Sequence, residues 1–227
     1  MQKFSLVGFD CDGVLLDSNR LKSSAFADCL SGYPSDIVVE FLKFQATAFG
    51  KSRYRLFDIF FSDYLSRDPF PGERERILFR FSSLCSEGYP KCEITAGAVD
   101  ALEWLKAQKI PMYVASGSDE AELRLVLEEI NLSKYFSGIF GSPTSKLDNL
   151  KKINDLAPAA GRHLFFGDAK ADWEASQAAG FEFVYISGYS ADPDGMHSLQ
   201  KQHSFRQQDD LSFVVNNIFN SKFDLSD

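Results

Sequence analysis

Phe9-Asp10-Cys11-Asp12-Gly13-Val14-Leu15-Leu16-Asp17-Ser18 is the most informative segment of this sequence. It continues the apolar run Leu6-Val7-Gly8-Phe9, which predicts a buried strand that delivers Asp10 and Asp12 at its C-terminal end. Strand residues two apart share a face, and Gly13 allows a sharp turn, so the two carboxylates can converge. Converging carboxylates repel each other and make poor core material. An oxygen-ligated cation such as Mg²⁺ would resolve that repulsion, whereas the ordinary alternative is a solvated Asp-Gly turn.

Helix patterns alternate with short apolar strands from residue 93 onward. This alternation predicts an α/β fold: a Rossmann-like parallel sheet with helices on both faces. In such sheets ligands bind beyond the carboxyl ends of the strands. The segment 188–202 is polar, and we expect irregular structure there. The expected helices span 95–108, 119–130, 145–156, 171–179 and 211–219, and the later strands span 110–115, 136–140, 164–166 and 181–186.

Residues 21–89 have a different character, because they carry helical patterns and no convincing strand. Turn signals around 32–34, 68–69 and 71–72 separate these patterns. We therefore expect a small all-α cap domain over residues 18–91, inserted after the first strand. The α/β core domain would then consist of residues 1–17 and 92–227.

Composition limits the classes of function. The net charge of −8 argues against nucleic acid as a partner, and no run approaches the roughly twenty apolar residues of a membrane span. The chain runs directly into a strand, so we expect no signal peptide. The cysteines Cys11, Cys29, Cys85 and Cys92 have no metal-binding spacing and indicate reduced thiols. These features favour a cytoplasmic protein and leave its oligomeric state open.

Polar side chains recur where successive strands are expected to end. Ser116 and Gly117 follow the second strand, and Gly117 offers a bare backbone N–H to an anion. Lys146 stands at the start of a helix, where a bound phosphate would offset its unfavourable interaction with the helix dipole. Asp168 and Asp172 follow a fourth strand. Each feature alone is typical of a helix cap or a solvated charge, but together they indicate one site at one edge of the sheet.

The motifs DCDGVLLDS, Ser116, Lys146 and GDAKAD resemble the four motifs of the haloacid dehalogenase (HAD) superfamily. The helical insert is similar to the cap of its phosphoglycolate phosphatase and β-phosphoglucomutase branch. The resemblance implies that Asp10 is the nucleophile and Asp12 the general acid/base. It also implies that Ser116 and Lys146 hold the transferring phosphate. The implied Mg²⁺ ligands are Asp10, the backbone carbonyl of Asp12, Asp168 and Asp172.

The implied activity is Mg²⁺-dependent hydrolysis of a small phosphorylated metabolite through an aspartyl phosphate, with sugar phosphates among the candidates. Asp12 favours phosphate esters, since relatives that cleave carbon–halogen or carbon–phosphorus bonds lack this aspartate. A β-phosphoglucomutase-like phosphomutase is the alternative, although Lys22 stands where those enzymes present a histidine. A binding protein without turnover is less consistent with four intact motifs.

Residues 49–53 resemble a substrate loop of the mutases, which makes Arg53 the main candidate for a substrate contact from the cap. Lys51 and Arg20 are weaker candidates. An ion pair between Arg53 and a nearby acid, Asp58 or Asp63, is the structural alternative. We expect the cap to open and close around hinges near 18–20 and 89–93.

Overall fold

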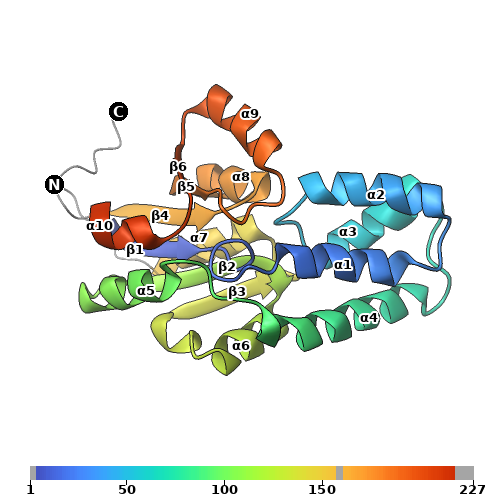
Figure 1. Cartoon of the computed structure of the whole chain (residues 1–227), viewed down its shortest axis with the longest axis horizontal. Helices are drawn as coiled ribbons and strands as arrows, with labels where there is room; N and C mark the ends of the chain where they lie inside the picture. Colours follow the sequence, from blue (N-terminus) through green and yellow to red (C-terminus); the bar gives the residue numbers. More distant parts are fainter. Residues whose placement is uncertain (1–3, 157–160, 218–227) are drawn as a thin grey trace.

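The computed structural model describes residues 4–156 and 161–217 and has a six-stranded parallel sheet at its centre (Figure 1). The strand order is β3-β2-β1-β4-β5-β6, the order of doubly wound folds, so the predicted α/β class is confirmed. Strand β1 lies in the interior of the sheet, between β2 and β4. The strands span Phe4–Phe9 (β1), Met112–Asp119 (β2), Gly138–Ser142 (β3), Arg162–Gly167 (β4), Glu182–Ile186 (β5) and Arg206–Gln208 (β6).

The register of the sheet brings the candidate residues to one edge. Phe9 pairs with Val114 of β2 and with Phe166 of β4, so β1 and β4 end at nearly the same level, whereas β2 continues to Asp119 and contains Ser116 and Gly117. Asp10 follows Phe9 directly, and Asp168 follows Phe166 after one residue. Pairing between β2 and β3 shifts register between Ala115 and Asp119, at the same edge. Such irregularities are common beside active sites because they re-aim side chains.

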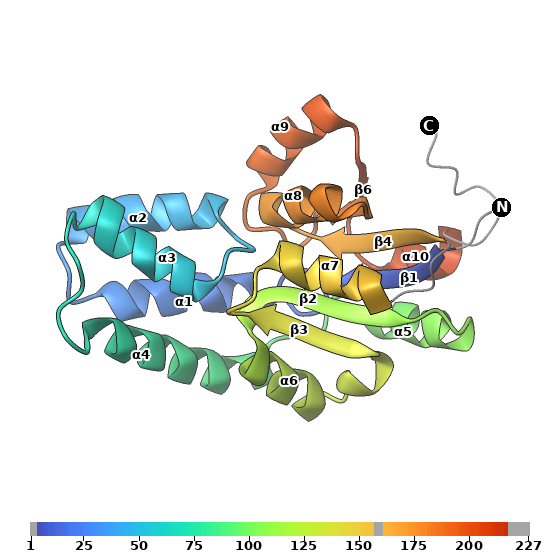
Figure 2. The same ribbon diagram turned by 180° about the vertical axis from the view of Figure 1, so that it is seen from behind.

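Helices cover both faces of the sheet, as the sequence predicts (Figures 1 and 2). Val7 and Phe9 of β1 pack in the same apolar cluster as residues of α5, α6 and α10, whereas Leu6 packs with residues of α7 and α8 on the other face. This alternation is the period of two of a strand buried on both sides. The covering helices span Ala98–Ala107 (α5), Glu120–Glu129 (α6), Lys146–Leu156 (α7), Lys170–Ala179 (α8), Pro193–His203 (α9) and Ser212–Asn217 (α10), with short 3₁₀ turns at Tyr89–Lys91 and Ser133–Tyr135.

A helical insert (residues 19–88) lies between β1 and β2 and extends to one side of the sheet (Figure 1). Phenylalanine rings fill its interior: Phe26 lies 4.5 Å from Phe81 and 5.0 Å from Phe57 between ring centroids. These rings account for part of the high phenylalanine content of the chain. The insert contains Asn19–Leu30 (α1), Ser35–Thr47 (α2), Arg53–Ile59 (α3), a π-helical turn at Phe60–Tyr64 and Glu73–Gly88 (α4).

Two features near the C-terminus differ from the prediction. The polar segment 188–202 is not irregular, because α9 occupies Pro193–His203. Asp192 caps this helix, and Met196 is the one buried residue within 193–203. A single buried side chain gives too weak an apolar period for recognition. Strand β6 was also not predicted, since it has only three polar residues at the edge of the sheet. The closing helix α10 is present, and residues 218–219 of its predicted range lie outside the described residues.

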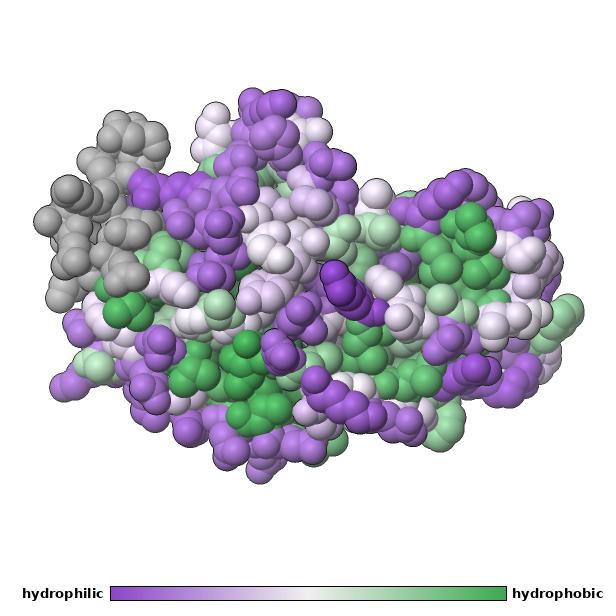
Figure 3. All heavy atoms as spheres, in the orientation of Figure 1, coloured by the Kyte–Doolittle hydropathy of each residue, from purple (hydrophilic) through white to green (hydrophobic). Residues whose placement is uncertain are grey.

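The surface mixes polar and apolar side chains, and Figure 3 shows apolar areas broken by hydrophilic residues on one face. Among the described residues, the helical insert exposes Val39, Phe70 and Phe79. Within the same described part of the chain, no helix combines the length and apolar character that a membrane crossing needs.

The buried carboxylate of Glu73 stabilises the turn that precedes α4 in the insert. Glu73 accepts hydrogen bonds from Arg67, from the Tyr33 hydroxyl at 2.8 Å and from the Phe70 N–H at 2.7 Å. The bonds from Arg67 are the main cause that lowers the pKa of Glu73 to about 2, from a usual 4.5. Because the folded-state pKa is lowered, the stabilisation is complete above about pH 4.5 and is lost as the pH falls towards 2.

We therefore expect Glu73→Gln to lower the free energy of unfolding by about 1 kcal/mol at neutral pH. The difference from the wild type should shrink below about pH 4.5, where the unfolded wild-type carboxylate becomes protonated. Urea unfolding of both proteins between pH 7 and pH 3 measures this difference. A difference that stays constant over this range would contradict the assignment.

Candidate active site

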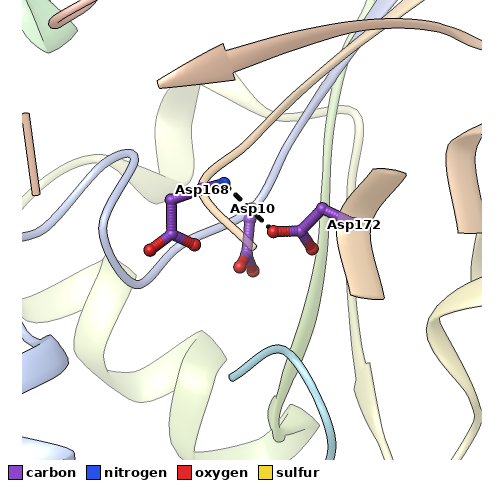
Figure 4. A group of neighbouring side chains, drawn as sticks. All are labelled: Asp10, Asp168 and Asp172. Carbon is purple, nitrogen blue, oxygen red and sulfur yellow. Dashed lines mark hydrogen bonds between the residues drawn. The ribbon is translucent and has the colours of Figure 1, made fainter. Parts of the chain in front are cut away.

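Three buried aspartates converge at the carboxyl edge of the sheet (Figure 4). Asp10 follows β1, while Asp168 follows β4 and Asp172 lies in the first turn of α8. One carboxylate oxygen from each lies within 4.8 Å of the other two. The Asp172 carboxylate also accepts hydrogen bonds from the N–H groups of Asp168, at 3.1 Å, and Ala169, at 3.0 Å. Hydrogen bonds to the local backbone therefore fix the position of the Asp172 carboxylate, and the strand register fixes the positions of Asp10 and Asp168.

The electrostatics of this group fit a divalent cation. Burial raises the pKa of Asp10 to about 7 and holds the pKa of Asp168 well above its usual range. Buried carboxylates with raised pKa values lack sufficient positive charge nearby, and an all-oxygen donor set suits Mg²⁺. The cluster contains three of the four predicted metal ligands. The side chain of the fourth, Asp12, faces other partners, and ligation by its backbone carbonyl stays a prediction.

Lys146 supplies the one amino group that contacts this cluster among the described residues. Its Nζ lies 3.1 Å from Asp10 Oδ2 and also pairs with Asp172. Burial alone would lower the pKa of Lys146, but the two carboxylates outweigh burial and raise it. The ammonium is therefore permanently charged beside Asp10. The role of Lys146 in holding a phosphate stays a prediction.

Asp12 occupies a separate set of hydrogen bonds, two residues from Asp10. One oxygen accepts from the Ser18 hydroxyl at 2.6 Å and from the Tyr89 hydroxyl at 2.8 Å. The other accepts from the Ser118 hydroxyl at 2.9 Å and from the Lys22 ammonium. Burial acts to raise the pKa of Asp12, but the Lys22 charge and these donors outweigh it and lower the pKa to about 2. The two aspartates of the first motif therefore have opposite pKa shifts.

Gly13 turns the chain after Asp12 and packs against the metal-site candidates. Its φ is +76°, a left-handed conformation that favours glycine, and a Cβ there would collide with the carboxylate of Asp168. The next residues bring Asn19 close, and its Nδ2 donates to Asp168 Oδ2 at 2.7 Å. The turn thus couples the start of α1 to the aspartate cluster.

Ser116 and Gly117 lie at the predicted sheet edge, where the helical insert touches the core. The Ser116 hydroxyl is buried and accepts a hydrogen bond from the N–H of Ser118 at 3.2 Å. A Cβ on Gly117 would lie only 2.5 Å from the backbone oxygen of Gly50, in the loop before α3. This close approach requires glycine at 117. It also shows that the insert lies over the strand end.

The three candidate substrate residues of the insert lie in different surroundings. Arg53 is buried and pairs with Glu122 of α6 through both of its terminal nitrogens, so its partner is neither Asp58 nor Asp63. Lys51 and Arg20 are exposed. Lys51 lines the cavities on either side of its loop, while Arg20 lines a separate cavity beside Asn19 and Tyr189. The roles of these three residues stay predictions.

Several contacts at the site, including the following, do not follow from the sequence. Ser118 and Tyr89 bind Asp12, Asn19 binds Asp168, and Glu122 binds Arg53. Tyr89 lies in the segment predicted as a hinge, and Ser118 lies two residues after the motif serine, so both positions carried a weak signal. Glu122 is 69 residues from its partner, and nothing in the local sequence connects them.

Comparison with known proteins supports this description. Residues 4–180 match the model of the haloacid dehalogenase-like hydrolases. Phosphoglycolate phosphatase 1 of Pseudomonas aeruginosa is 29% identical over 127 residues, which cover 52% of this chain and 46% of that protein. The chain therefore spans about half the length of the curated relatives it matches.

Solved structures show the same fold over nearly the whole chain. A hydrolase from Pseudomonas syringae matches with a TM-score of 0.76 and 18% identity, covering 94% of this chain and 97% of that one. A predicted phosphoglycolate phosphatase from Haemophilus somnus matches with a TM-score of 0.71 and 17% identity, covering 95% and 98%. Together with the motif residues gathered at the sheet edge, the match over residues 4–180 places this chain in the family of haloacid dehalogenase-like hydrolases.

Proposed function

We propose that this protein is a Mg²⁺-dependent phosphatase that hydrolyses a small phosphate monoester through a phosphoaspartate at Asp10. The observation that carries the proposal is the placement of Asp10. Its carboxylate contacts the ammonium of Lys146 and clusters with the carboxylates of Asp168 and Asp172. Family membership and the curated relatives named phosphoglycolate phosphatase support the same class of reaction.

In the proposed chemistry, the two aspartates of the first motif have different roles: one is the nucleophile and the other transfers protons. The Asp10 carboxylate attacks phosphorus, and the bond between phosphorus and the alcohol oxygen breaks. Asp12 protonates the departing oxygen, then removes a proton from the water that hydrolyses the phosphoaspartate. Lys146, Ser116 and the Gly117 N–H would hold the phosphate oxygens. A bound Mg²⁺, held by Asp10, Asp168 and Asp172, would neutralise negative charge on the transferring group.

Lys22 bears on the proton transfer, because it binds Asp12 from the first helix of the insert. A carboxylate paired with an ammonium is held ionised, because the positive charge lowers its affinity for a proton. Asp12 can act as an acid only after Lys22 has withdrawn. We propose that residues 18–91 form a cap whose movement makes and breaks this contact, with hinges near 18–20 and 89–93.

The ion pair that Arg53 makes with Glu122 favours hydrolysis over phosphomutase activity. A mutase must hold a second phosphate, and Arg53 is the residue that the resemblance would assign to it. Both of its terminal nitrogens are bonded to Glu122. We propose a cytoplasmic enzyme, and the substrate panel includes sugar phosphates as well as phosphoglycolate, after which the curated relatives are named.

A hydrolysis screen tests the proposed function. Purified protein is incubated with p-nitrophenyl phosphate, phosphoglycolate and sugar phosphates, with Mg²⁺ or with excess chelator, and released phosphate is measured. We expect turnover that requires Mg²⁺. A bisphosphorylated sugar in the same panel reports mutase activity as isomerised product. Absence of Mg²⁺-dependent phosphate release from every ester would overturn the proposal.

A further inference from the structure

A small cavity lies between the helical insert and the core, beside Asp12. It offers about 20 Å³ to the centre of a water-sized molecule, enough for about one water. Ser118 and Gly117 line it from the core, so it adjoins the candidate phosphate site. Under the proposed function, the alcohol part of the ester must lie on this side of the phosphate. Because the cavity has room for about one water, the helical insert must move away from the core to admit the alcohol, whose first atoms then face the wall of the cavity.

Two cations of this wall, Arg53 and the partly exposed Lys22, are already neutralised. Arg53 of α3 makes a bidentate pair with Glu122 of α6, and the Ser82 hydroxyl of α4 also bonds to Glu122. The side chains of Arg53 and Glu122 are 4% and 18% exposed, so water screens this pair little. Lys22 is bonded to Asp12 and to Ser118. Lys51 remains without a carboxylate partner among the described residues, but it is an exposed lysine at the mouth of the cavity.

The polar group left free in the cavity wall is an amide. Gln45 of α2 is 2% exposed and lines the cavity, and its side chain has no hydrogen-bond partner within residues 4–156 and 161–217. A buried amide without a partner is unfavourable, which indicates that a ligand or water completes it. The rest of the wall is apolar and includes Phe26, Phe49, Leu56 and Phe81.

We infer that the leaving group of the substrate is an uncharged alcohol bearing at least one further hydroxyl, which the Gln45 amide recognises. This inference rests on the proposed phosphatase function and specifies its substrate class. A carboxylate in the same place would find Lys22 and Arg53 already paired with Asp12 and Glu122, and it could bind Arg53 only by breaking the ion pair between Arg53 and Glu122. Breaking one side of a buried ion pair is strongly unfavourable. Glu122 is thus a specificity-determining residue that disfavours carboxylate-bearing esters such as phosphoglycolate.

The experiment compares two esters that differ in a single group. Glycerol 3-phosphate carries a hydroxymethyl group where 3-phosphoglycerate carries a carboxylate. With Mg²⁺ present, we expect the wild-type kcat/KM to favour glycerol 3-phosphate at least about tenfold. p-Nitrophenyl phosphate serves as the reference for phosphoryl transfer that does not depend on this recognition.

Variants assign the preference to the residues named. Glu122→Gln should release the Arg53 charge and raise the ratio of 3-phosphoglycerate to glycerol 3-phosphate activity about tenfold or more. Glu128→Gln removes the same charge from an exposed position of the same helix and should leave the ratio at its wild-type value. Gln45→Leu removes one neutral hydrogen bond and should lower kcat/KM for glycerol 3-phosphate, relative to p-nitrophenyl phosphate, about fivefold.

The outcomes separate the two claims. Turnover of p-nitrophenyl phosphate together with a preference for 3-phosphoglycerate would overturn the inference and leave the phosphatase function standing. An unchanged substrate ratio in both Glu122→Gln and Gln45→Leu, with turnover retained, would do the same. Absence of Mg²⁺-dependent turnover of all three esters would overturn the proposed function, and the inference with it.

Discussion

Asp10→Asn should abolish phosphate ester hydrolysis, with a loss of at least about 10⁴-fold in kcat. The amide is close in size to the carboxylate but cannot attack phosphorus as a nucleophile, and no other described carboxylate occupies the end of β1 with the same ammonium contact. The measurement is the release of p-nitrophenolate with saturating Mg²⁺. Because a good leaving group needs little help from Asp12, this ester isolates the nucleophilic step.

Asp28→Asn is the matched control for this substitution, because Asp28 is an exposed residue of α1. The control should retain wild-type kcat. Thermal unfolding of both variants verifies that each is folded. Turnover by folded Asp10→Asn within tenfold of the wild type would remove Asp10 from the role of nucleophile.

Asp168→Asn should weaken the apparent affinity for Mg²⁺ at least about 100-fold. The side chain belongs to the buried cluster that we propose as the metal site, and an amide lacks the charge of the carboxylate. Titration of hydrolysis against Mg²⁺ gives one readout. The second does not depend on turnover, because a ligand that binds only the folded state raises its melting temperature. Mg²⁺ should therefore stabilise the wild type and have little effect on Asp168→Asn.

The metal-free proteins should show the opposite order of stability. Burial and the neighbouring aspartates hold the pKa of Asp168 well above its usual range, which means that its ionised form destabilises the fold when no cation is bound. Removing that charge should raise the melting temperature in chelator. A variant that keeps the wild-type response to Mg²⁺ would contradict the ligand role of Asp168. The same measurements on Asp194→Asn, at an exposed position of α9, provide the control.

The sequence predicted the fold and the aspartate cluster because both depend on strong local patterns. Apolar runs buried on two faces and the motif acids at their ends place Asp10, Asp168 and Asp172 through sheet register alone. Helix α6, which lies within the predicted range 119–130, illustrates the same point, since Asp119 caps it by accepting from two N–H groups at 3.0 and 3.2 Å. Short polar elements such as β6 carry no such pattern.

The contacts between the insert and the core could not be predicted in the same way. Arg53 has Asp58 close by in sequence, but Asp58 pairs with Arg74 instead. The packing of α3 against the core selects Glu122, and that choice depends on how two distant helices meet. The hydrogen bond from Tyr89 to Asp12 has the same origin, because it joins residues 77 positions apart. Such pairings follow from tertiary packing, which single-sequence patterns do not encode.

The phosphoaspartate itself provides the most direct test of the proposed mechanism. Wild-type protein is mixed with Mg²⁺ and a ³²P-labelled phosphate ester, quenched in acid during the first turnover, digested and mapped. We expect an acid-stable, base-labile label on the peptide that contains Asp10, and no label in Asp10→Asn. Label on a different residue would contradict the account. So would phosphate release throughout the first turnover without labelled protein at any time point.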